Sequence, residues 1–289
     1  MKTLRITGVP EHFNFPWKKV VESQPFLANG IQLHWTDESR GSGQMNKALR
    51  DAETDVAIVL TESFLKDFEE GNSSRIIGFH VKSPLIWGIH IPGLSPVEKL
   101  NEIENPQFLV SRMGSGSHLM AFLLAQREGW NPENLEFKIV GNLDGALDAM
   151  NPESPGMFLW EKYTTKPWVD SGKFKRIGEV PSPWPCFVMV ASEKAISEFG
   201  EVLFQLRDLV YQTSAEIQID PQTPLEIQNR YDLSLEDVKA WLSQTVWETE
   251  ATISQTEMEL AMEKMKELGI IKSTLRFERF LNLDHLQIV

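Results

Sequence analysis

Hydrophobic and polar positions alternate in blocks that predict strands and helices in turn through the first two thirds of the chain. The apolar run Asp55–Leu60, rich in β-branched residues, predicts a buried strand, and the following segment Thr61–Phe68 predicts a helix. Comparable apolar runs predict further strands at Leu4–Val9, Ile31–Thr36, Arg75–Val81, Pro84–Ile91, Gln107–Arg112, Phe137–Asn142, Gly156–Glu161, Phe174–Val180 and Cys186–Ala191. Such alternation is typical of an α/β fold with mostly parallel sheets flanked by helices.

The last third of the chain has a helical pattern instead. Apolar residues recur at helical spacing in Glu198–Gln212, Leu235–Val246 and Ser254–Leu268. A chain of 289 residues is long enough for two cores. We therefore predict two lobes: residues 1–91 plus 192–289 form lobe one, which carries the C-terminal helices, and residues 92–191 form lobe two. The chain would cross between them near Gly88–Gly93 and Ala191–Glu193.

Two Gly/Ser turns, one in each predicted lobe, each lead into a helix pattern. The first turn contains Gly41, Ser42, Gly43 and Gln44, and the second contains Gly114, Ser115, Gly116, Ser117 and His118. A helix start of this kind directs backbone N–H groups and the positive end of the helix dipole at one point, which favours an anion. The alternative is a plain loop whose serine caps the helix. Neither turn has the spacing of a Walker A loop or of a GxGxxG fingerprint.

Other polar and aromatic residues follow the predicted strands directly. Ligands of open α/β sheets bind outside the carboxyl ends of the strands, so these residues are candidate ligand contacts: Pro10, Glu11, His12, Phe13, Asn14, Thr61, Glu62, Asn142, Trp160 and Glu161. Glu161, next to Trp160, is the preferred carboxylate for a buried contact, and the alternative for it is a surface residue or a helix cap.

Composition argues against several classes of function. A formal net charge of −13 argues against binding to nucleic acid or to an anionic membrane surface. The single cysteine, Cys186, forms no intrachain disulfide and fits an inert core position, and the six histidines lack metal-ligand spacing. We therefore predict no metal and no cofactor. The first residues lack the apolar core of a signal peptide, and no apolar run of transmembrane length occurs. These features predict a cytoplasmic protein, or an extracytoplasmic one if a signal has been removed.

Several of these motifs together resemble the type II periplasmic-binding-protein family, in the branch of nitrate-, sulfonate- and thiamine-precursor-binding proteins. The resemblance rests on Gly41-Ser42-Gly43 with the later Glu53-Thr54-Asp55-Val56-Ala57, and on Ser111-Arg112-Met113-Gly114-Ser115-Gly116-Ser117. A further segment is similar to a subgroup without signal peptides that has cytosolic and fungal members: Phe158-Leu159-Trp160-Glu161-Lys162-Tyr163-Thr164-Thr165. The match runs in order along nearly the whole chain.

The resemblance implies a solute-binding protein that closes around a small polar or anionic organic ligand, with an ABC permease as a possible partner. Thiamine-pyrimidine synthases of the family carry a cysteine-rich motif, which a chain with one cysteine lacks. Cytosolic dehydratases and lyases of menaquinone biosynthesis share the fold. An enzyme using His12, Glu11 or Glu161 as general acid or base is therefore one alternative. A ligand-sensing regulatory protein is another.

Overall fold

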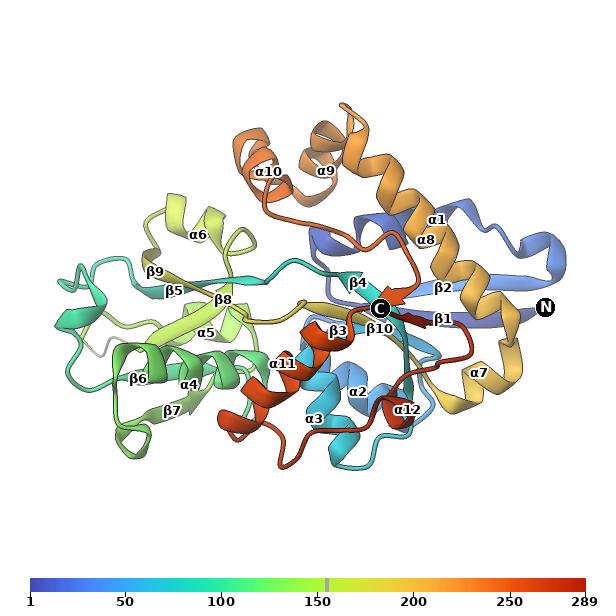
Figure 1. Cartoon of the computed structure of the whole chain (residues 1–289). Coiled ribbons are helices and arrows are strands. Elements are labelled where there is room, and N and C mark those ends of the chain that lie inside the picture. Colours follow the sequence, from blue (N-terminus) through green and yellow to red (C-terminus); the bar gives the residue numbers. More distant parts are fainter. Residues whose placement is uncertain (154–155) are drawn as a thin grey trace. The chain divides into compact units, whose positions relative to one another are not determined.

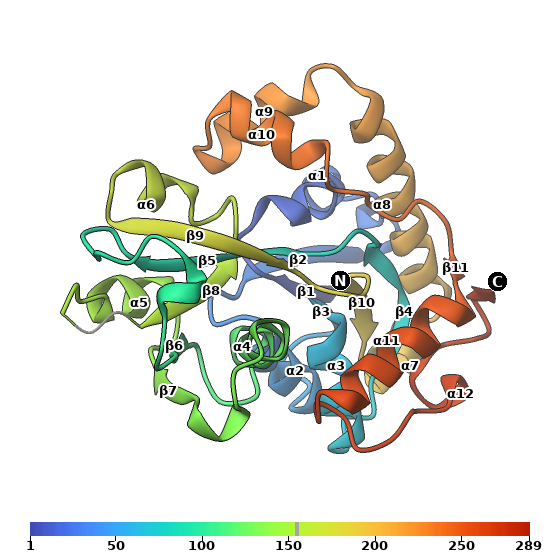
Figure 2. The ribbon, with the colours of Figure 1, turned by 60° about the vertical axis from the view of Figure 1, so that its left-hand side comes forward.

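The computed structural model describes residues 1–153 and 156–289, and the chain divides into two compact units. Unit 1 contains Met1–Pro84 and Trp184–Val289, and unit 2 contains Leu85–Pro183. Each unit has its own five-stranded sheet with helices on both faces (Figures 1 and 2). The α/β class predicted from the sequence is confirmed.

The sheet of unit 1 has the order β2-β1-β3-β10-β4. Strands β1, β2 and β3 are parallel, and β10 runs antiparallel to both of its neighbours, β3 and β4. The strands are β1 (Lys2–Gly8), β2 (Ile31–Asp37), β3 (Val56–Leu60), β4 (Arg75–Val81) and β10 (Phe187–Ala191). The first four residues of β3 are completely buried, because helices cover both sides of the sheet.

Helices α1 (Phe15–Ser23) and α8 (Glu201–Ile219) pack together on one face of this sheet, and α2 (Ser42–Arg50) and α3 (Thr61–Glu69) cover the other (Figure 1). The remaining elements of unit 1 are η1 (His12–Asn14), η2 (Leu27–Asn29), α7 (Glu193–Phe199), α9 (Thr223–Tyr231), α10 (Leu235–Leu242), β11 (Thr252–Ile253), α11 (Gln255–Glu267), α12 (Phe277–Phe280) and β12 (Gln287–Ile288).

The sheet of unit 2 has the order β7-β6-β8-β5-β9. Here β5 is the strand that runs against its neighbours. The strands are β5 (Ile86–Pro92), β6 (Gln107–Val110), β7 (Glu136–Ile139), β8 (Met157–Glu161) and β9 (Phe174–Pro181). The helices are η3 (Leu100–Glu102), α4 (Gly116–Glu128), η4 (Pro132–Asn134), α5 (Leu143–Ala149) and α6 (Lys166–Asp170). Residues Leu109, Ala146, Phe158 and Phe174 form a core cluster to which α5 and α6 contribute apolar side chains.

The chain passes between the units at 84/85 and 183/184, whereas the sequence placed the passages near 91/92 and 191/192. The difference arises because β5 pairs with β8 and β9, and β10 pairs with β3 and β4. In each unit, hydrogen bonds join the two segments that lie next to these passages. In unit 1 the backbone N–H of Cys186 donates to the Ser83 carbonyl oxygen, at 3.3 Å. In unit 2 Ser182 N–H donates to the Leu85 carbonyl at 2.9 Å, and Leu85 N–H donates to Ser182 Oγ at 3.0 Å.

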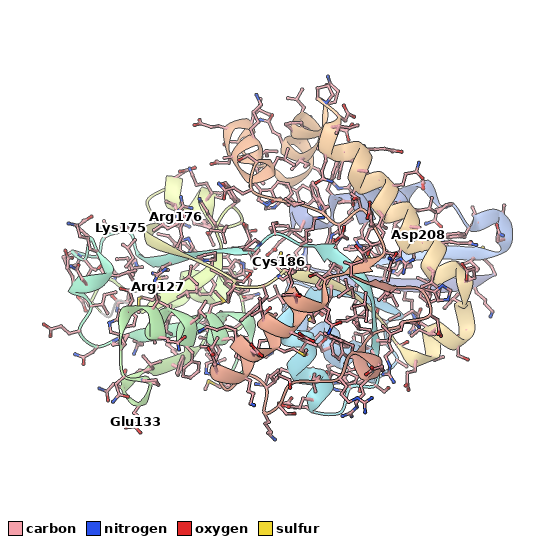
Figure 3. The ribbon with its side chains drawn as sticks, viewed as in Figure 1. Arg127, Glu133, Lys175, Arg176, Cys186 and Asp208 are labelled. Atoms are coloured by element: carbon pink, nitrogen blue, oxygen red, sulfur yellow. The ribbon has the colours of Figure 1, made fainter. Side chains whose placement is uncertain are left out.

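Two further differences concern helices and the cysteine. The predicted helix Glu198–Gln212 is divided between α7 and α8, because Gly200 adopts a φ of +52° and ends α7. Helix α9 was not predicted, since its sequence is largely polar. Cys186 is buried beside the start of β10, as predicted for an inert core position (Figure 3).

Candidate ligand-binding site

The candidate residues of unit 1 lie at one edge of its sheet. Pro10–Asn14 follow the carboxyl end of β1, Gly41–Gln44 follow β2, and Thr61 and Glu62 follow β3. Because β2, β1 and β3 are parallel and adjacent, these three segments leave the sheet side by side. The structure thus places the unit 1 residues that the sequence singled out after the same ends of three adjacent strands.

The start of α2 carries the first Gly/Ser turn. Gly41 precedes the helix with a φ of +81°, a conformation that favours glycine, and no side chain of the described residues caps the helix. The Ser42 hydroxyl does not cap α2. It accepts a hydrogen bond from the Leu60 N–H at 2.9 Å. This bond holds the start of α2 against the end of β3, immediately before α3 begins. The positive ends of two helix dipoles are therefore neighbours here.

One backbone oxygen of the loop after β1 is bonded to two distant segments of the chain. The Phe13 carbonyl accepts hydrogen bonds from His80 Nε2 and from Trp247 Nε1, both at 2.8 Å. His12 is buried, with its ring centroid 4.2 Å from that of Trp241. Burial lowers the pKa of His12 to about 3, so its imidazole is neutral at physiological pH and is a poor general base.

Glu62 is a buried carboxyl with one strong partner. It stands in the first turn of α3, is 1% exposed, and its Oε2 accepts a hydrogen bond from Trp184 Nε1 at 2.7 Å. Burial raises the pKa of Glu62 to about 7, although the Trp184 bond and its own backbone N–H favour the charged form. The neighbouring Thr61 donates its hydroxyl to the Pro185 carbonyl at 2.6 Å and thereby fixes the start of α3.

In unit 2 the second Gly/Ser turn is bonded mainly to itself. Ser115 caps α4 by accepting from the His118 N–H at 3.4 Å, and the Gly114 N–H donates to His118 Nδ1 at 3.0 Å. The Ser117 hydroxyl accepts from the Ser111 N–H at 3.0 Å and lies 3.1 Å from the Ser115 hydroxyl. The serine hydroxyls that the sequence offered to a ligand therefore have partners inside the turn.

The other candidates of unit 2 also have internal partners. Asn142 caps α5 through the Gly145 N–H at 3.0 Å, and the Trp160 ring stacks on Phe158 with centroids 5.1 Å apart. Glu161 is buried, and its Oε2 accepts the backbone N–H groups of Tyr163 and Thr164 at 2.9 and 2.6 Å. Burial raises the pKa of Glu161, against the effect of these two bonds.

Sequence reasoning missed three positioning residues of unit 1. His80 and Trp247 hold the loop after β1, and Asn46 contacts the first turn of α3 through Ser63. Only Asn46 had a local signal, because it lies four residues after Ser42 and so shares its side of the helix. His80 and Trp247 come from distant segments, and no spacing connects them with Phe13.

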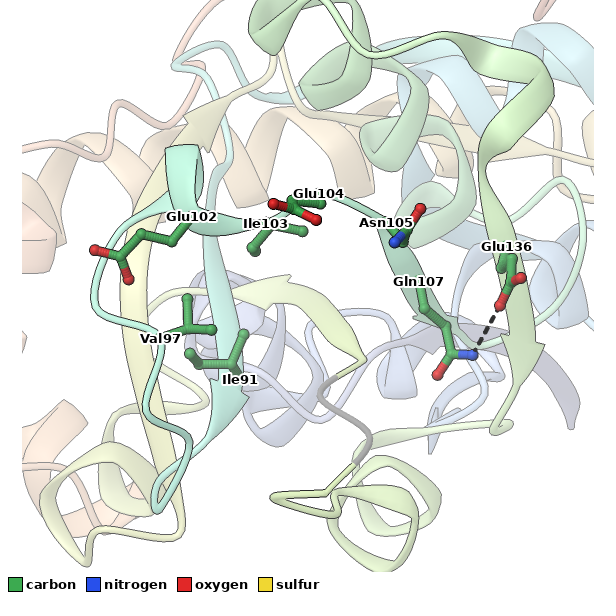
Figure 4. Close-up of a pocket in the computed structure, with 8 residues that line it drawn as sticks. All are labelled: Ile91, Val97, Glu102, Ile103, Glu104, Asn105, Gln107 and Glu136. Carbon is green, nitrogen blue, oxygen red and sulfur yellow. Dashed lines mark hydrogen bonds between the residues drawn. The ribbon is translucent and has the colours of Figure 1, made fainter.

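A separate pocket of unit 2 has a volume of about 340 Å³ and an acidic lining (Figure 4). It lies by the starts of β6 and β7, at the opposite edge of the sheet from the Gly/Ser turn, and includes Glu102, Glu104 and Glu136. Within residues 1–153 and 156–289, no cluster of His, Cys, Asp or Glu is arranged to hold a metal ion. In the same part of the chain, no helix combines the length and the apolarity needed to span a membrane.

Comparison with known proteins identifies the fold. Residues 92–180 match the family described as Ca3427-like PBP. A solved structure from Candida albicans, of the CA3427 gene product that defines a family with the generic periplasmic binding protein fold, is 25% identical. It superposes with a TM-score of 0.83 over 95% of this chain and 92% of its own. No curated protein sequence matches the chain at a significant level.

Bacterial binding proteins also superpose on the chain. The alkanesulfonate-binding protein SsuA from Xanthomonas axonopodis pv. citri, bound to MOPS, gives a TM-score of 0.78 at 12% identity, covering 100% of this chain and 99% of its own. A ligand-binding component of an ABC-type import system from Staphylococcus aureus, with zinc bound, gives 0.76 at 13% identity, covering 98% and 97%. The resemblance to type II periplasmic binding proteins that the sequence indicated is confirmed.

Proposed function

We propose that this chain, which has the type II periplasmic-binding-protein fold, is a substrate-binding protein of the ABC-transporter type that captures a small anionic or polar organic molecule between its two lobes. The observation that carries the proposal is the uncapped start of α2, which the Ser42–Leu60 bond holds beside the start of α3. Two helix N-termini at one sheet edge favour a negatively charged group.

The proposed ligand contacts are the predicted residues at the carboxyl ends of the strands. In unit 1 they are the loop Pro10–Asn14, the turn Gly41–Gln44, and Thr61 with Glu62. In unit 2 they are the turn Gly114–His118, with Asn142, Trp160 and Glu161. Anion binding by the sulfonate-binding neighbour, and by a Prochlorococcus marinus neighbour in complex with methylphosphonate, supports a ligand of this class.

The proposed mechanism is closure, with no bond made or broken. A ligand that contacts both lobes stabilises the closed state relative to the open one. A shift from 1:99 to 99:1 requires about 5.5 kcal/mol of differential binding. Hydrogen bonds to uncapped helix N–H groups, made only when the anion is present, contribute to this difference.

Titration of the intact protein with small alkanesulfonates and alkylphosphonates tests the proposal. We expect a rise in melting temperature and a fall in the radius of gyration measured by small-angle scattering. Matched alkyl alcohols, which lack the anionic group, serve as the control ligands. Absence of both changes across the anionic series would overturn the proposal.

A further inference from the structure

The junction of α2 and α3 contains two buried oxygen atoms that accept hydrogen bonds and have no donor among the residues that the structure describes. They are Glu62 Oε1 and Asn46 Oδ1, on side chains that are each 1% exposed. A buried acceptor without a partner costs about 1–3 kcal/mol, and more if it is charged. A ligand that supplies the donors would remove this cost at both atoms.

The orientation of Asn46 is fixed by its neighbours. Its amide nitrogen lies 3.0 Å from the Ser63 carbonyl oxygen and 3.2 Å from Ser63 Oγ. A carbonyl oxygen can only accept, so the NH₂ group of Asn46 must face Ser63. The oxygen of Asn46 is thus the atom that has no partner among the described residues. Asn46 contacts α3 at Ser63, the residue that follows Glu62.

The orientation of Glu62 follows from the same reasoning. The Trp184 indole N–H donates to Oε2 at 2.7 Å, which leaves Oε1 for another donor. No described Lys, Arg or His forms an ion pair with this carboxyl. The ionised form of Glu62 is therefore compensated within the described chain only by its hydrogen bonds, and a cationic ligand group would favour it.

We propose that Glu62 and Asn46 form an acceptor pair that selects ligands bearing an N–H donor group, such as an ammonium, next to their anionic group. The inference rests on the proposed function, since it refines the ligand class of that site. The uncapped start of α2 takes the anion and the acceptor pair takes the donor. The Ser42–Leu60 bond keeps the two subsites adjacent.

The test compares two probes that differ by one amine: propane-1-sulfonate and 3-aminopropane-1-sulfonate. Isothermal titration calorimetry on the intact protein at pH 7.5 measures both dissociation constants. We expect the amine to strengthen binding by about tenfold or more in the wild type, the size of one charge-assisted bond. In Glu62→Gln, which keeps an acceptor for Trp184 but removes the charge, this preference should fall below about threefold. Glu70→Gln, an exposed change just after α3, is the matched control and should keep the preference.

The outcomes separate the inference from the proposed function. Equal affinity of the two probes for the wild type would overturn the acceptor pair while leaving anion capture in place. A preference for the amine that survives unchanged in Glu62→Gln would also overturn it. Failure of both probes to bind would overturn sulfonate capture itself, and the acceptor pair with it.

Discussion

The two sheet edges of this molecule carry nearly the same sequence pattern and use it in different ways. Each has a Gly/Ser turn at a helix start and a buried glutamate where a strand ends. In unit 2 the serine hydroxyls of the turn have hydrogen-bond partners within the turn, and Glu161 Oε2 accepts from the N–H groups of Tyr163 and Thr164. Among the residues that the structure describes, no side chain caps α2 in unit 1, and no donor bonds to Glu62 Oε1. Similar motifs thus differ at the helix start: a serine caps α4 in unit 2, whereas among the described residues no side chain caps α2 in unit 1.

The difference originates in where two serine hydroxyls point. Ser115 stands before its helix and caps it, whereas Ser42 lies inside its helix and binds the neighbouring strand. In a capped helix one of the first N–H groups already donates a hydrogen bond, so the helix start attracts an anion less strongly. Electrostatic attraction for a ligand is therefore expected to be greater in unit 1.

The largest expected effect is on stability. Glu161→Ala leaves the N–H groups of Tyr163 and Thr164 without their acceptor, which should cost about 3–5 kcal/mol of unfolding free energy. Glu62→Ala loses one indole bond but removes a buried carboxyl, so its cost should be about 1 kcal/mol. Urea unfolding at pH 7.5, followed by far-UV circular dichroism, measures both. Equal losses of unfolding free energy in Glu161→Ala and Glu62→Ala would contradict the proposed difference between the two sheet edges.

The next effect is the pH dependence due to Glu62. Its pKa is 4.5 without the fold and about 7 in the folded protein. The favourable contribution of the protonated form is complete below pH 4.5 and is lost as pH rises to 7, a difference of about 3 kcal/mol. Glu62→Gln does not titrate, so its stability relative to wild type should rise by that amount between pH 4.5 and pH 8.

Buried histidines contribute in the opposite direction. The pKa of His12 is lowered to about 3 and that of His80 to about 4, so their contribution is present above pH 6.5 and lost as pH falls. The wild type and Glu62→Gln share these histidines, so the difference between their unfolding free energies reports on Glu62 alone. Glu70→Gln is the control here as well. A difference between variant and wild type that stays constant across this pH range would contradict the buried state of Glu62.

The smallest expected effect is on affinity. Gln44→Glu places a negative charge in the first turn of α2 and should weaken binding of propane-1-sulfonate by about tenfold, the value of one nearby charge at intermediate screening. Met113→Glu puts the same charge on the exposed residue before the second turn, where we expect about a twofold loss. Calorimetry gives both constants. A larger loss from Met113→Glu would assign the main anion contact to unit 2.

Local patterns in the sequence predicted most elements but few of their partners. The β-branched run before Leu60 and the turn at Gly41 lead to β3 and α2 as expected, because their signals lie within a few residues. Strand β5 follows β4 directly in the chain, yet it pairs with β8 and β9 far along the sequence. Pairing over such distances depends on how whole sheets bury their faces, which no local window contains.

The candidate site shows the same limit at the level of side chains. The strand ends located Glu62 and the Gly/Ser turns correctly at sheet edges. The pattern did not reveal that Trp184 would bond to Glu62, or that Ser42 would leave α2 uncapped. Both facts depend on side-chain rotamers set by neighbours more than 17 residues away.

The paired hydrogen bonds where the chain leaves and re-enters unit 1 make residues 85–183 a natural insert. The Ser83–Cys186 bond brings the two ends of the surrounding chain together, and the Leu85–Ser182 bonds do the same for the inserted segment. Exchange of such a cassette needs only two junctions. The segment that forms unit 2 can therefore be exchanged while the sheet of unit 1 is kept.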